Sequence, residues 1–267
     1  MDPILRYLLS QVIRLCPRAL RAWFWQKLSD SRLTIRGVRL PSALGLFIKY
    51  SRTPYEATVL PYVAARTSIP VPTVIDSVQI QEKLFALVIT EMPGYDLDAT
   101  FREMTDAQTA HVARQLSGLL AQIRALPHPQ APQVCGLDGG PIYDNRLSYD
   151  MYPWGPFASV PEFHEYMVKR SDLRFDNCED PEAVLAVLRQ SHSKPHRVCF
   201  THGDFHPGNI LVDDDFNVTA ILDWEMAAWM PEYWYVLRDL CSYEISDFRN
   251  RFVLLQGVYE VCLATPL

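Results

Sequence analysis

The stretch FTHGDFHPGNILVDDDFNVTAILDWE, from Phe200 to Glu225, decides the fold of this chain. It contains five Asp, one Glu and two His between apolar runs that are typical of buried strands. Two interpretations are open. The acidic residues could belong to a solvated hairpin turn, or they could form a site that holds metal ions and a phosphoryl group.

The spacing of the polar residues favours the second interpretation. His202, Asp204 and Asn209 follow the pattern His-x-Asp-x-x-x-x-Asn, and Asp223 follows on the next expected strand. The catalytic loop of protein kinases has this interval, and a later Asp in kinases holds magnesium. Phosphoryl transfer needs a carboxylate that accepts the proton of the hydroxyl, and oxygen ligands for Mg²⁺. We interpret Asp213–Asp215 as residues of the solvated turn between the two strands.

Length and composition limit the classes of protein to which the chain can belong. The chain has 267 residues, of which 49% are hydrophobic, and a formal net charge of −6. This length allows one large domain or two small lobes, and the mild acidity argues against nucleic-acid binding. Six scattered cysteines without a CxxC pair argue against a zinc site and favour a reducing compartment, so we expect a cytoplasmic protein. No apolar run approaches the ~18 residues of a transmembrane segment.

The N-terminal segment 1–28 is basic and apolar. Its apolar residues recur at helical spacing, and its charged residues are Asp2, Arg6, Arg14, Arg18, Arg21 and Lys27. A mitochondrial transit peptide or a membrane-surface helix would have this pattern. We favour the alternative of a helix that packs on the body with solvated arginines, because transit peptides are richer in Ser and seldom contain WFW.

The remaining pattern predicts short strands and longer helices. We expect strands over 33–40, 44–51, 83–92, 209–213 and 218–224. We expect helices over 53–67, 105–127, 161–170 and 181–190, an extended connector over 68–77, and mainly helical structure soon after Trp229. Strands that gather early and helices that gather late predict an α+β chain of two lobes.

Two of the expected helices begin with a capping box, in which a Thr and a Glu or Gln three residues later exchange hydrogen bonds with backbone amides. Thr105 and Gln108 form this pattern at the start of the clearest helix. Thr53 and Glu56 form it at the start of the earlier one, where Pro54 suits the first helical position.

The opening stretch resembles a known family. HGDFHPGNIL followed by ILDWE is similar to the aminoglycoside phosphotransferase and choline kinase superfamily of small-molecule kinases, whose fold is protein-kinase-like. The resemblance is nearest to uncharacterised phosphotransferase members common in filamentous fungi and covers about Leu33 to Tyr243. It implies a small β-rich, nucleotide-binding N-lobe over 31–92 and a larger helical, catalytic and substrate-binding C-lobe over 93–267. The basic segment with helical spacing would form a helical extension over 1–30 before these lobes.

The resemblance implies roles for three residues of the opening stretch. Asp204 would be the catalytic base or orienting carboxylate, and Asn209 and Asp223 would bind Mg²⁺. His202 is better explained as a packing residue, and His206 receives no role.

The resemblance implies further roles in the N-lobe, for ATP. Lys49 would contact the α- and β-phosphates, and Glu56 would pair with Lys49. The capping box with Thr53 explains a Glu at this position as well, so both roles of Glu56 stay open. Glu91 and Met92 would form the hinge that offers backbone groups to adenine.

Departures from the family pattern leave alternatives. Segment 35–46 contains only Gly37 and Gly45 in place of a GxGxxG phosphate-covering loop, so a non-catalytic pseudokinase or nucleotide-binding scaffold is the alternative function. A protein kinase is disfavoured, because Gly203 replaces the Arg of His-Arg-Asp, Asp-Trp-Glu replaces Asp-Phe-Gly, and Ala-Pro-Glu is missing. The sequence ends at Leu267, soon after the last expected helix, so a shortened C-lobe is also kept open.

The acceptor is expected to be a small-molecule hydroxyl, which family kinship does not identify further. Aromatic and acidic residues follow the metal aspartate: Trp224, Glu225, Trp229, Glu232 and Trp234. Together with Tyr152 and Trp154 they could hold a cationic amine through cation–π and ion-pair contacts. The alternative is that these aromatic side chains form the core of a helical lobe. The sequence gives no indication of the oligomeric state.

Overall fold

The computed structural model describes residues 10–13, 15–30, 37–40, 44–144, 153–171 and 195–234, together with positions 182, 190 and 193. The chain divides into two compact units. The first contains Met1–Gln122, His206–Glu225 and Glu244–Leu267, and the second contains Ile123–Phe205 and Met226–Tyr243. The lobe limits expected from the sequence stay a prediction. The helix expected over 181–190 lies almost entirely outside the described residues.

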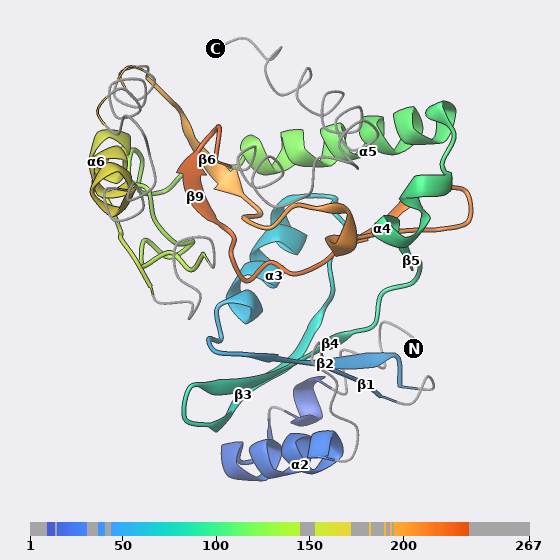
Figure 1. The fold of residues 1–267 in the computed structure, drawn as a ribbon. Coiled ribbons are helices and arrows are strands. Elements are labelled where there is room, and N and C mark those ends of the chain that lie inside the picture. Colours follow the sequence, from blue (N-terminus) through green and yellow to red (C-terminus); the bar gives the residue numbers. More distant parts are fainter. Residues whose placement is uncertain are drawn as a thin grey trace. The chain divides into compact units, whose positions relative to one another are not determined.

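The first unit is built on a four-stranded antiparallel sheet in the order β1-β2-β4-β3 (Figure 1). Its strands are β1 (Val38–Arg39), β2 (Leu46–Ser51), β3 (Val74–Gln81) and β4 (Leu84–Thr90). β1, β2 and β4 fall within predicted strands. β3 corrects the prediction of an extended connector, because Ile75 and Val78 are buried in the core. Two register shifts between β3 and β4 interrupt the alternation of buried and exposed side chains that would have predicted a strand.

Helix α2 (Arg18–Asp30) lies against this sheet (Figure 1). Trp25 is buried in one cluster with Ile48 and Ile75. The Trp25 indole Nε1–H donates to Asp76 Oδ2 at 2.7 Å, and Arg21 forms an ion pair with the same carboxylate. For the described part of the N-terminal segment, the packed helix is therefore confirmed.

Two further helices and a small sheet complete the described part of the first unit. The helices of more than one turn are α3 (Glu56–Arg66) and α5 (Asp106–Arg124). The sheet has the order β5-β7-β8, with β5 (Tyr95–Asp96), β7 (Ile210–Val212) and β8 (Val218–Ile221). Short turns α4 (Leu97–Thr100), η1 (Phe101–Glu103) and η3 (Pro207–Asn209) adjoin this sheet in the sequence.

The turn between β7 and β8 confirms part of the prediction for the acidic run. The Asn217 amide N–H donates to Asp213 Oδ1 at 2.8 Å, and the Asp215 amide N–H donates to the same oxygen at 3.0 Å. These hydrogen bonds from Asn217 and Asp215 lower the pKa of the exposed Asp213 carboxyl. Asp213 is therefore a turn residue.

The second unit holds the strand pair β6 (Val198–Thr201) and β9 (Ala228–Pro231), and helix α6 (Val160–Ser171), which confirms the helix predicted over 161–170. β9 was not predicted; its residues pair with β6. The helical structure expected soon after Trp229 falls almost entirely outside the described residues, which end at Trp234 in this region. Trp229 and Trp234 are buried, as is Trp224 of the first unit, so the core alternative is confirmed for these three side chains. Trp154 is also buried, whereas Tyr152 lies outside the described residues.

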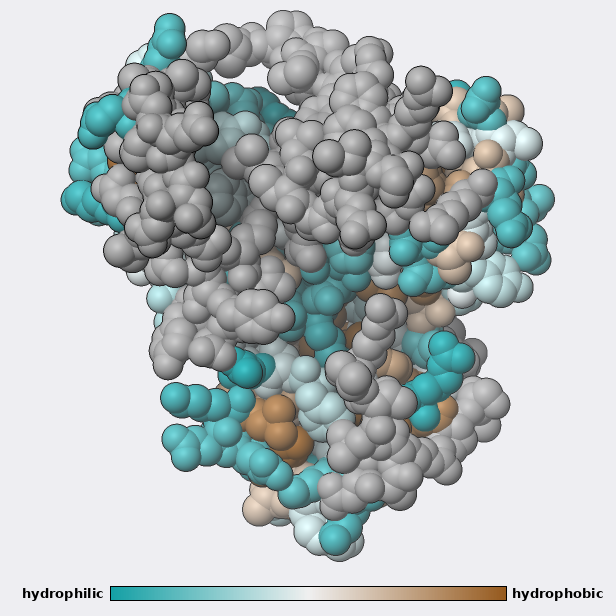
Figure 2. All heavy atoms as spheres, in the orientation of Figure 1, coloured by the Kyte–Doolittle hydropathy of each residue, from teal (hydrophilic) through white to brown (hydrophobic). Residues whose placement is uncertain are grey.

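Hydrophilic side chains predominate on the described part of the face seen in Figure 2, where apolar side chains gather only in small patches. Across the described residues, no helix combines the length and apolar character needed to cross a bilayer.

Candidate active site

Lys49 of β2 is the centre of a cluster of charged side chains in the first unit. In the antiparallel register Lys49 lies opposite Leu87 of β4, which fixes the position of its backbone. Its ammonium Nζ lies 2.7 Å from Glu56 Oε2, 2.6 Å from Asp223 Oδ1 and 3.3 Å from Glu225 Oε2. One cation thus contacts three carboxylates that come from α3 and from the segment after β8.

The electrostatics of this cluster keep Lys49 charged. Burial by itself would lower the pKa of the Lys49 amine, but the carboxylates of Glu56, Asp223 and Glu225 outweigh it and raise the pKa above its ordinary value. Burial and repulsion from Asp223 raise the pKa of the Glu56 and Glu225 carboxyls, although Lys49 acts in the opposite direction. The cluster therefore carries an excess of negative charge around one ammonium group.

Glu56 uses both of its carboxylate oxygens. Oε2 accepts from Lys49 Nζ, and Oε1 accepts from the backbone N–H of Trp224 at 3.0 Å. Its carboxylate is buried, with a side-chain exposure of 2%. The chain segment that carries Asp223 and Glu225 is thereby attached to the first turn of α3.

The capping box predicted for Thr53 and Glu56 is wrong. The Thr53 N–H donates to Ser51 Oγ at 3.3 Å, and Thr53 Oγ1 accepts only a long bond of 3.4 Å from the Tyr55 N–H. The helix starts instead with backbone bonds from Ala57 N–H to the Pro54 carbonyl at 3.1 Å. The carboxylate that would complete the box is held by Lys49 and by Trp224 N–H.

Asn209 and Asp223 lie at the same end of the β7–β8 hairpin. The Leu222 N–H donates to the Asn209 carbonyl at 2.8 Å, and the Ile221 N–H donates to the Pro70 carbonyl at 2.9 Å. Asn209 is nearly buried, and Asp223 follows β8 with φ of 65°, a left-handed conformation that Asp tolerates better than most residues. The ladder therefore ends at Asp223, whose side chain contacts Lys49.

The donor set fits a hard divalent cation. One carboxylate oxygen from each of Glu56, Asp223 and Glu225 lies within 4.8 Å of the others. The amide of Asn209 stands at the adjacent strand end, and carboxylate and amide oxygens are the ligands that Mg²⁺ prefers. The excess of carboxylates over the single ammonium group of Lys49 also favours an added positive charge.

Asp204 belongs to the second unit, where a tight turn places it directly after β6. The Asp204 N–H donates to His202 Nδ1 at 3.1 Å, and both residues are buried. Gly203 has φ of 83°, and a Cβ at this position would lie 2.1 Å from the Met226 carbonyl oxygen. The Arg of a His-Arg-Asp sequence would not fit here, and the histidine acts through the backbone of the turn.

The predicted hinge residues Glu91 and Met92 directly follow β4. The Glu91 N–H donates to the Gly45 carbonyl at 2.8 Å, and its carboxylate pairs with Arg39 at 2.7 Å. The Met92 sulfur accepts from the Thr90 hydroxyl at 3.8 Å. Glu91 thus joins the end of β4 to the start of β2.

Sequence reasoning placed Glu225 among residues for a cationic substrate and gave no role to Ser51. The structure places Glu225 on Lys49, and the Ser51 hydroxyl donates to Glu225 Oε2 at 3.4 Å. The signal that could have found Glu225 is its position only two residues after Asp223. His206 also has a structural role, because its Nδ1 accepts from the Gly208 N–H at 3.1 Å.

Comparisons with known proteins identify the family of this chain. A model of the family described as "Phosphotransferase enzyme family" matches residues 41–253, which is more than half of the chain. The chain belongs to the phosphotransferase enzyme family. It is also 28% identical over 64 residues to the probable choline kinase 3 of Arabidopsis thaliana, a match that spans 24% of this chain and only 18% of that relative.

Solved structures of phosphotransferases share the fold of this family member. The apo form of a thermostable mutant of aminoglycoside phosphotransferase APH(4)-Ia has a TM-score of 0.53 at 15% identity, over 83% of this chain and 71% of that one. The GDP and kanamycin complex of APH(2")-IIIa has a TM-score of 0.57 at 13% identity, over 92% and 84%. Macrolide 2'-phosphotransferase MphH from Brachybacterium faecium has a TM-score of 0.51 at 19% identity, over 81% and 69%. The predicted two-lobed, protein-kinase-like α+β fold is confirmed.

Proposed function

We propose that this family member transfers the γ-phosphoryl group of ATP to a hydroxyl group of a small molecule, with Mg²⁺ as cofactor. The observation that carries the proposal is the contact of Lys49 with both Glu56 and Asp223, at 2.7 and 2.6 Å. A lysine on a strand, a glutamate on the following helix and a metal-binding aspartate after the catalytic loop are the parts that phosphoryl transfer by kinases requires.

Each residue has a role that suits its position. Lys49 would contact the α- and β-phosphates, with Glu56 holding its ammonium group in place. Glu91 and Met92 would offer backbone groups to adenine. Within the described part of the chain, no hydrogen bond reaches the Met92 N–H or the Glu91 carbonyl. When bound by Asn209 and Asp223, Mg²⁺ would neutralise charge on the phosphate oxygens.

Asp204 would accept the proton of the acceptor hydroxyl. The acceptor oxygen forms a new bond to the γ-phosphorus, the bond from this phosphorus to the β–γ bridging oxygen breaks, and ADP leaves. Positioned general bases contribute ~10²–10⁴-fold in rate. A small-molecule acceptor is supported by structural neighbours that were solved in complex with kanamycin and with AMP-PNP and hygromycin B.

One observation favours a second candidate, a nucleotide-binding protein without transfer activity. Gly37 has φ of 128°, and a Cβ there would lie 2.4 Å from the Ile48 carbonyl oxygen. Close packing on β2 therefore explains this glycine, and the explanation needs no contact with a phosphate. Both candidates bind a nucleotide, but only the first transfers its phosphate to an acceptor.

The test is a thermal-shift measurement with ATP, with and without Mg²⁺, followed by a phosphorylation screen over amines, sugars and aminoglycosides. A ligand at 100 times its Kd stabilises a protein by about 2.7 kcal/mol. We expect a Mg²⁺-dependent shift that Asp223→Ala abolishes, and phosphate transfer that Asp204→Asn reduces by ~10²–10⁴-fold without loss of ATP binding. Binding without transfer to any acceptor would favour the second candidate, and the absence of ATP binding would contradict both.

A further inference from the structure

Helix α2 exposes large apolar side chains on its outer face. The exposed fractions are 52% for Leu20, 58% for Trp23 and 47% for Phe24. Positions i, i+3 and i+4 lie on one side of an α-helix, so these three side chains form one continuous surface. Val12 and Leu15, in the preceding residues of the same segment, are exposed as well. Exposed apolar patches of this kind mark interaction sites.

The orientation of α2 is fixed by its other face. Trp25 is buried in the core of the first unit, and its indole N–H donates to Asp76. Arg21 pairs with the same carboxylate, and Arg18 donates to Gln79 Oε1 at 3.0 Å. The helix cannot rotate to bury Trp23 and Phe24 without breaking these contacts. Both faces of α2 therefore carry apolar side chains, and within the described part of the chain only one face is covered.

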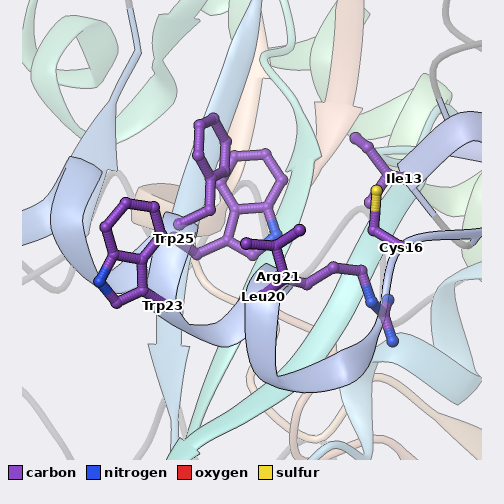
Figure 3. Close-up of a pocket in the computed structure, with 7 residues that line it drawn as sticks. Ile13, Cys16, Leu20, Arg21, Trp23 and Trp25 are labelled. Carbon is purple, nitrogen blue, oxygen red and sulfur yellow. The ribbon is translucent and has the colours of Figure 1, made fainter.

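A groove of about 260 Å³ lies beside the outer face and is lined mainly by apolar side chains, among them Ile13, Cys16, Leu20 and Trp23 (Figure 3). Figure 3 shows Trp23 and Leu20 on the helix, with Ile13 and Cys16 on the segment before it. Arg21 and Trp25 line the groove as well, so it extends from the exposed side chains toward the covered side of α2.

The charge of this region identifies the kind of partner. Residues 1–28 hold one acidic residue against five basic ones, whereas the whole chain has a net charge of −6. Among these basic residues, Arg18 and Lys27 are exposed on α2 itself. Apolar and aromatic side chains flanked by Lys and Arg suit a membrane surface that contains anionic lipids, because the rings enter the headgroup region while the cations contact phosphates.

A second copy of the chain fits this surface less well. A two-fold symmetric dimer through the outer face would bring the same basic side chains of both copies together. Like charges at an interface oppose association. We propose that the outer face of α2 binds the surface of membranes rich in anionic lipids, lying on the bilayer without crossing it.

The test is sedimentation of the 267-residue chain with vesicles. One set of vesicles contains phosphatidylcholine alone, and the other contains about 30% phosphatidylserine as the anionic lipid. We expect binding to the mixed vesicles that weakens with added salt. The variant Leu20→Ser/Trp23→Ser/Phe24→Ser should lower the partition coefficient by roughly 100-fold, because it removes most of the apolar area that would enter the headgroup region. Lys27→Gln should lower it by roughly fivefold, the effect of one basic residue near an anionic surface.

Tyr95→Ser is the matched control, because Tyr95 is exposed to a similar degree, 57%, but lies outside α2. It should bind vesicles as the parent does. Because Phe24 packs edge-to-face against Trp25, the triple variant should melt a few degrees below the parent, and binding is compared well below that temperature, where circular dichroism shows that every variant is folded. The proposal is overturned if the parent binds neither kind of vesicle, if the triple variant binds as well as the parent, or if sedimentation velocity shows a dimer that the triple variant abolishes.

Discussion

Two helix starts in the first unit have the same sequence pattern and different structures. At α5, the Thr105 N–H donates to Gln108 Oε1 at 2.8 Å and the Gln108 N–H donates to Thr105 Oγ1 at 3.3 Å, as a capping box requires. At α3, Thr53 and Glu56 make neither bond. A local rule thus holds where the side chain has no other partner and fails where a buried lysine competes for it.

The competition is decided by the magnitude of the interactions. A capping bond at an exposed helix start contributes about 1 kcal/mol. A hydrogen bond to a charged group contributes about 1.5–3 kcal/mol, so the Glu56 carboxylate contributes more beside the Lys49 ammonium group than at the helix start. Failures of local rules are expected mainly at functional sites, and the failure at α3 occurs where Lys49 holds the Glu56 carboxylate.

The largest effect is expected from Glu56→Gln, which tests the α3 side of the comparison. A glutamine has an NH₂ group in place of one carboxylate oxygen, so in the same orientation this NH₂ faces either Lys49 Nζ or the Trp224 N–H, both of which are donors. We expect phosphate transfer to fall on the order of 10²-fold. The free energy of unfolding should fall by about 2 kcal/mol, below the usual range for a broken buried pair, because Lys49 keeps Asp223 and Glu225.

Glu82→Gln is the control for Glu56→Gln, since it removes the same charge from an exposed residue of the β3–β4 turn. Turnover and chemical denaturation are measured for both variants. Activity and stability equal to the parent in Glu56→Gln would show that the contact with Lys49 contributes nothing, and the assignment of the site would be wrong.

A smaller effect is expected from Glu225→Gln. Glu225 Oε2 lies 3.3 Å from Lys49 Nζ, farther than the oxygens of Glu56 and Asp223, and its side chain is 20% exposed. We expect turnover to fall by about tenfold and the free energy of unfolding to change by less than about 1 kcal/mol. Steady-state kinetics with ATP as the varied substrate measure the turnover. A loss equal to that of Glu56→Gln would mean that Glu225 contacts the phosphate-bound metal directly.

Gln108→Ala tests the α5 side of the comparison. It removes one half of a formed capping box, so the free energy of unfolding should fall by about 1 kcal/mol. The melting temperature should fall by roughly 2–4 °C. Turnover per folded molecule should not change. Gln108→Glu should restore the stability, because a glutamate serves equally well at this position of the box. A loss of turnover in Gln108→Ala would mean that α5 contributes to the site.

The sequence predicted best what depends on neighbouring residues. The hairpin β7–β8, the turn at Asp213 and the start of α5 follow from turn and capping chemistry within a few residues. β6 and β9 were missed because VCFT and AWMP are short apolar runs, which periodicity cannot assign to a strand or a helix. β3 was missed because its register shifts break the alternation.

The candidate site depended on contacts between distant parts of the sequence. Lys49 and Asp223 are separated by 174 positions, so no local rule could pair them, and only the family resemblance suggested that they act together. Glu225 was assigned a different role, since its spacing from Asp223 does not say which cation it meets. The cap predicted at Thr53 was wrong because the rule takes no account of what lies beyond the helix.

The smallest effect is expected from Thr53→Ala, which compares the two threonines directly. Thr53 Oγ1 accepts only the 3.4 Å bond from Tyr55 N–H, so its loss should cost less than about 0.5 kcal/mol, whereas Thr105→Ala should cost about 1 kcal/mol. Chemical denaturation of the double variants measures whether the two residues of each pair are coupled. Thr105→Ala/Gln108→Ala should deviate from additivity by about 0.5 kcal/mol or more, as residues in one hydrogen-bond network do, and Thr53→Ala/Glu56→Gln should be additive. Coupling between Thr53 and Glu56 of the size seen at α5 would mean that the carboxylate spends much of its time on the helix start, and that Lys49 is held mainly by Asp223.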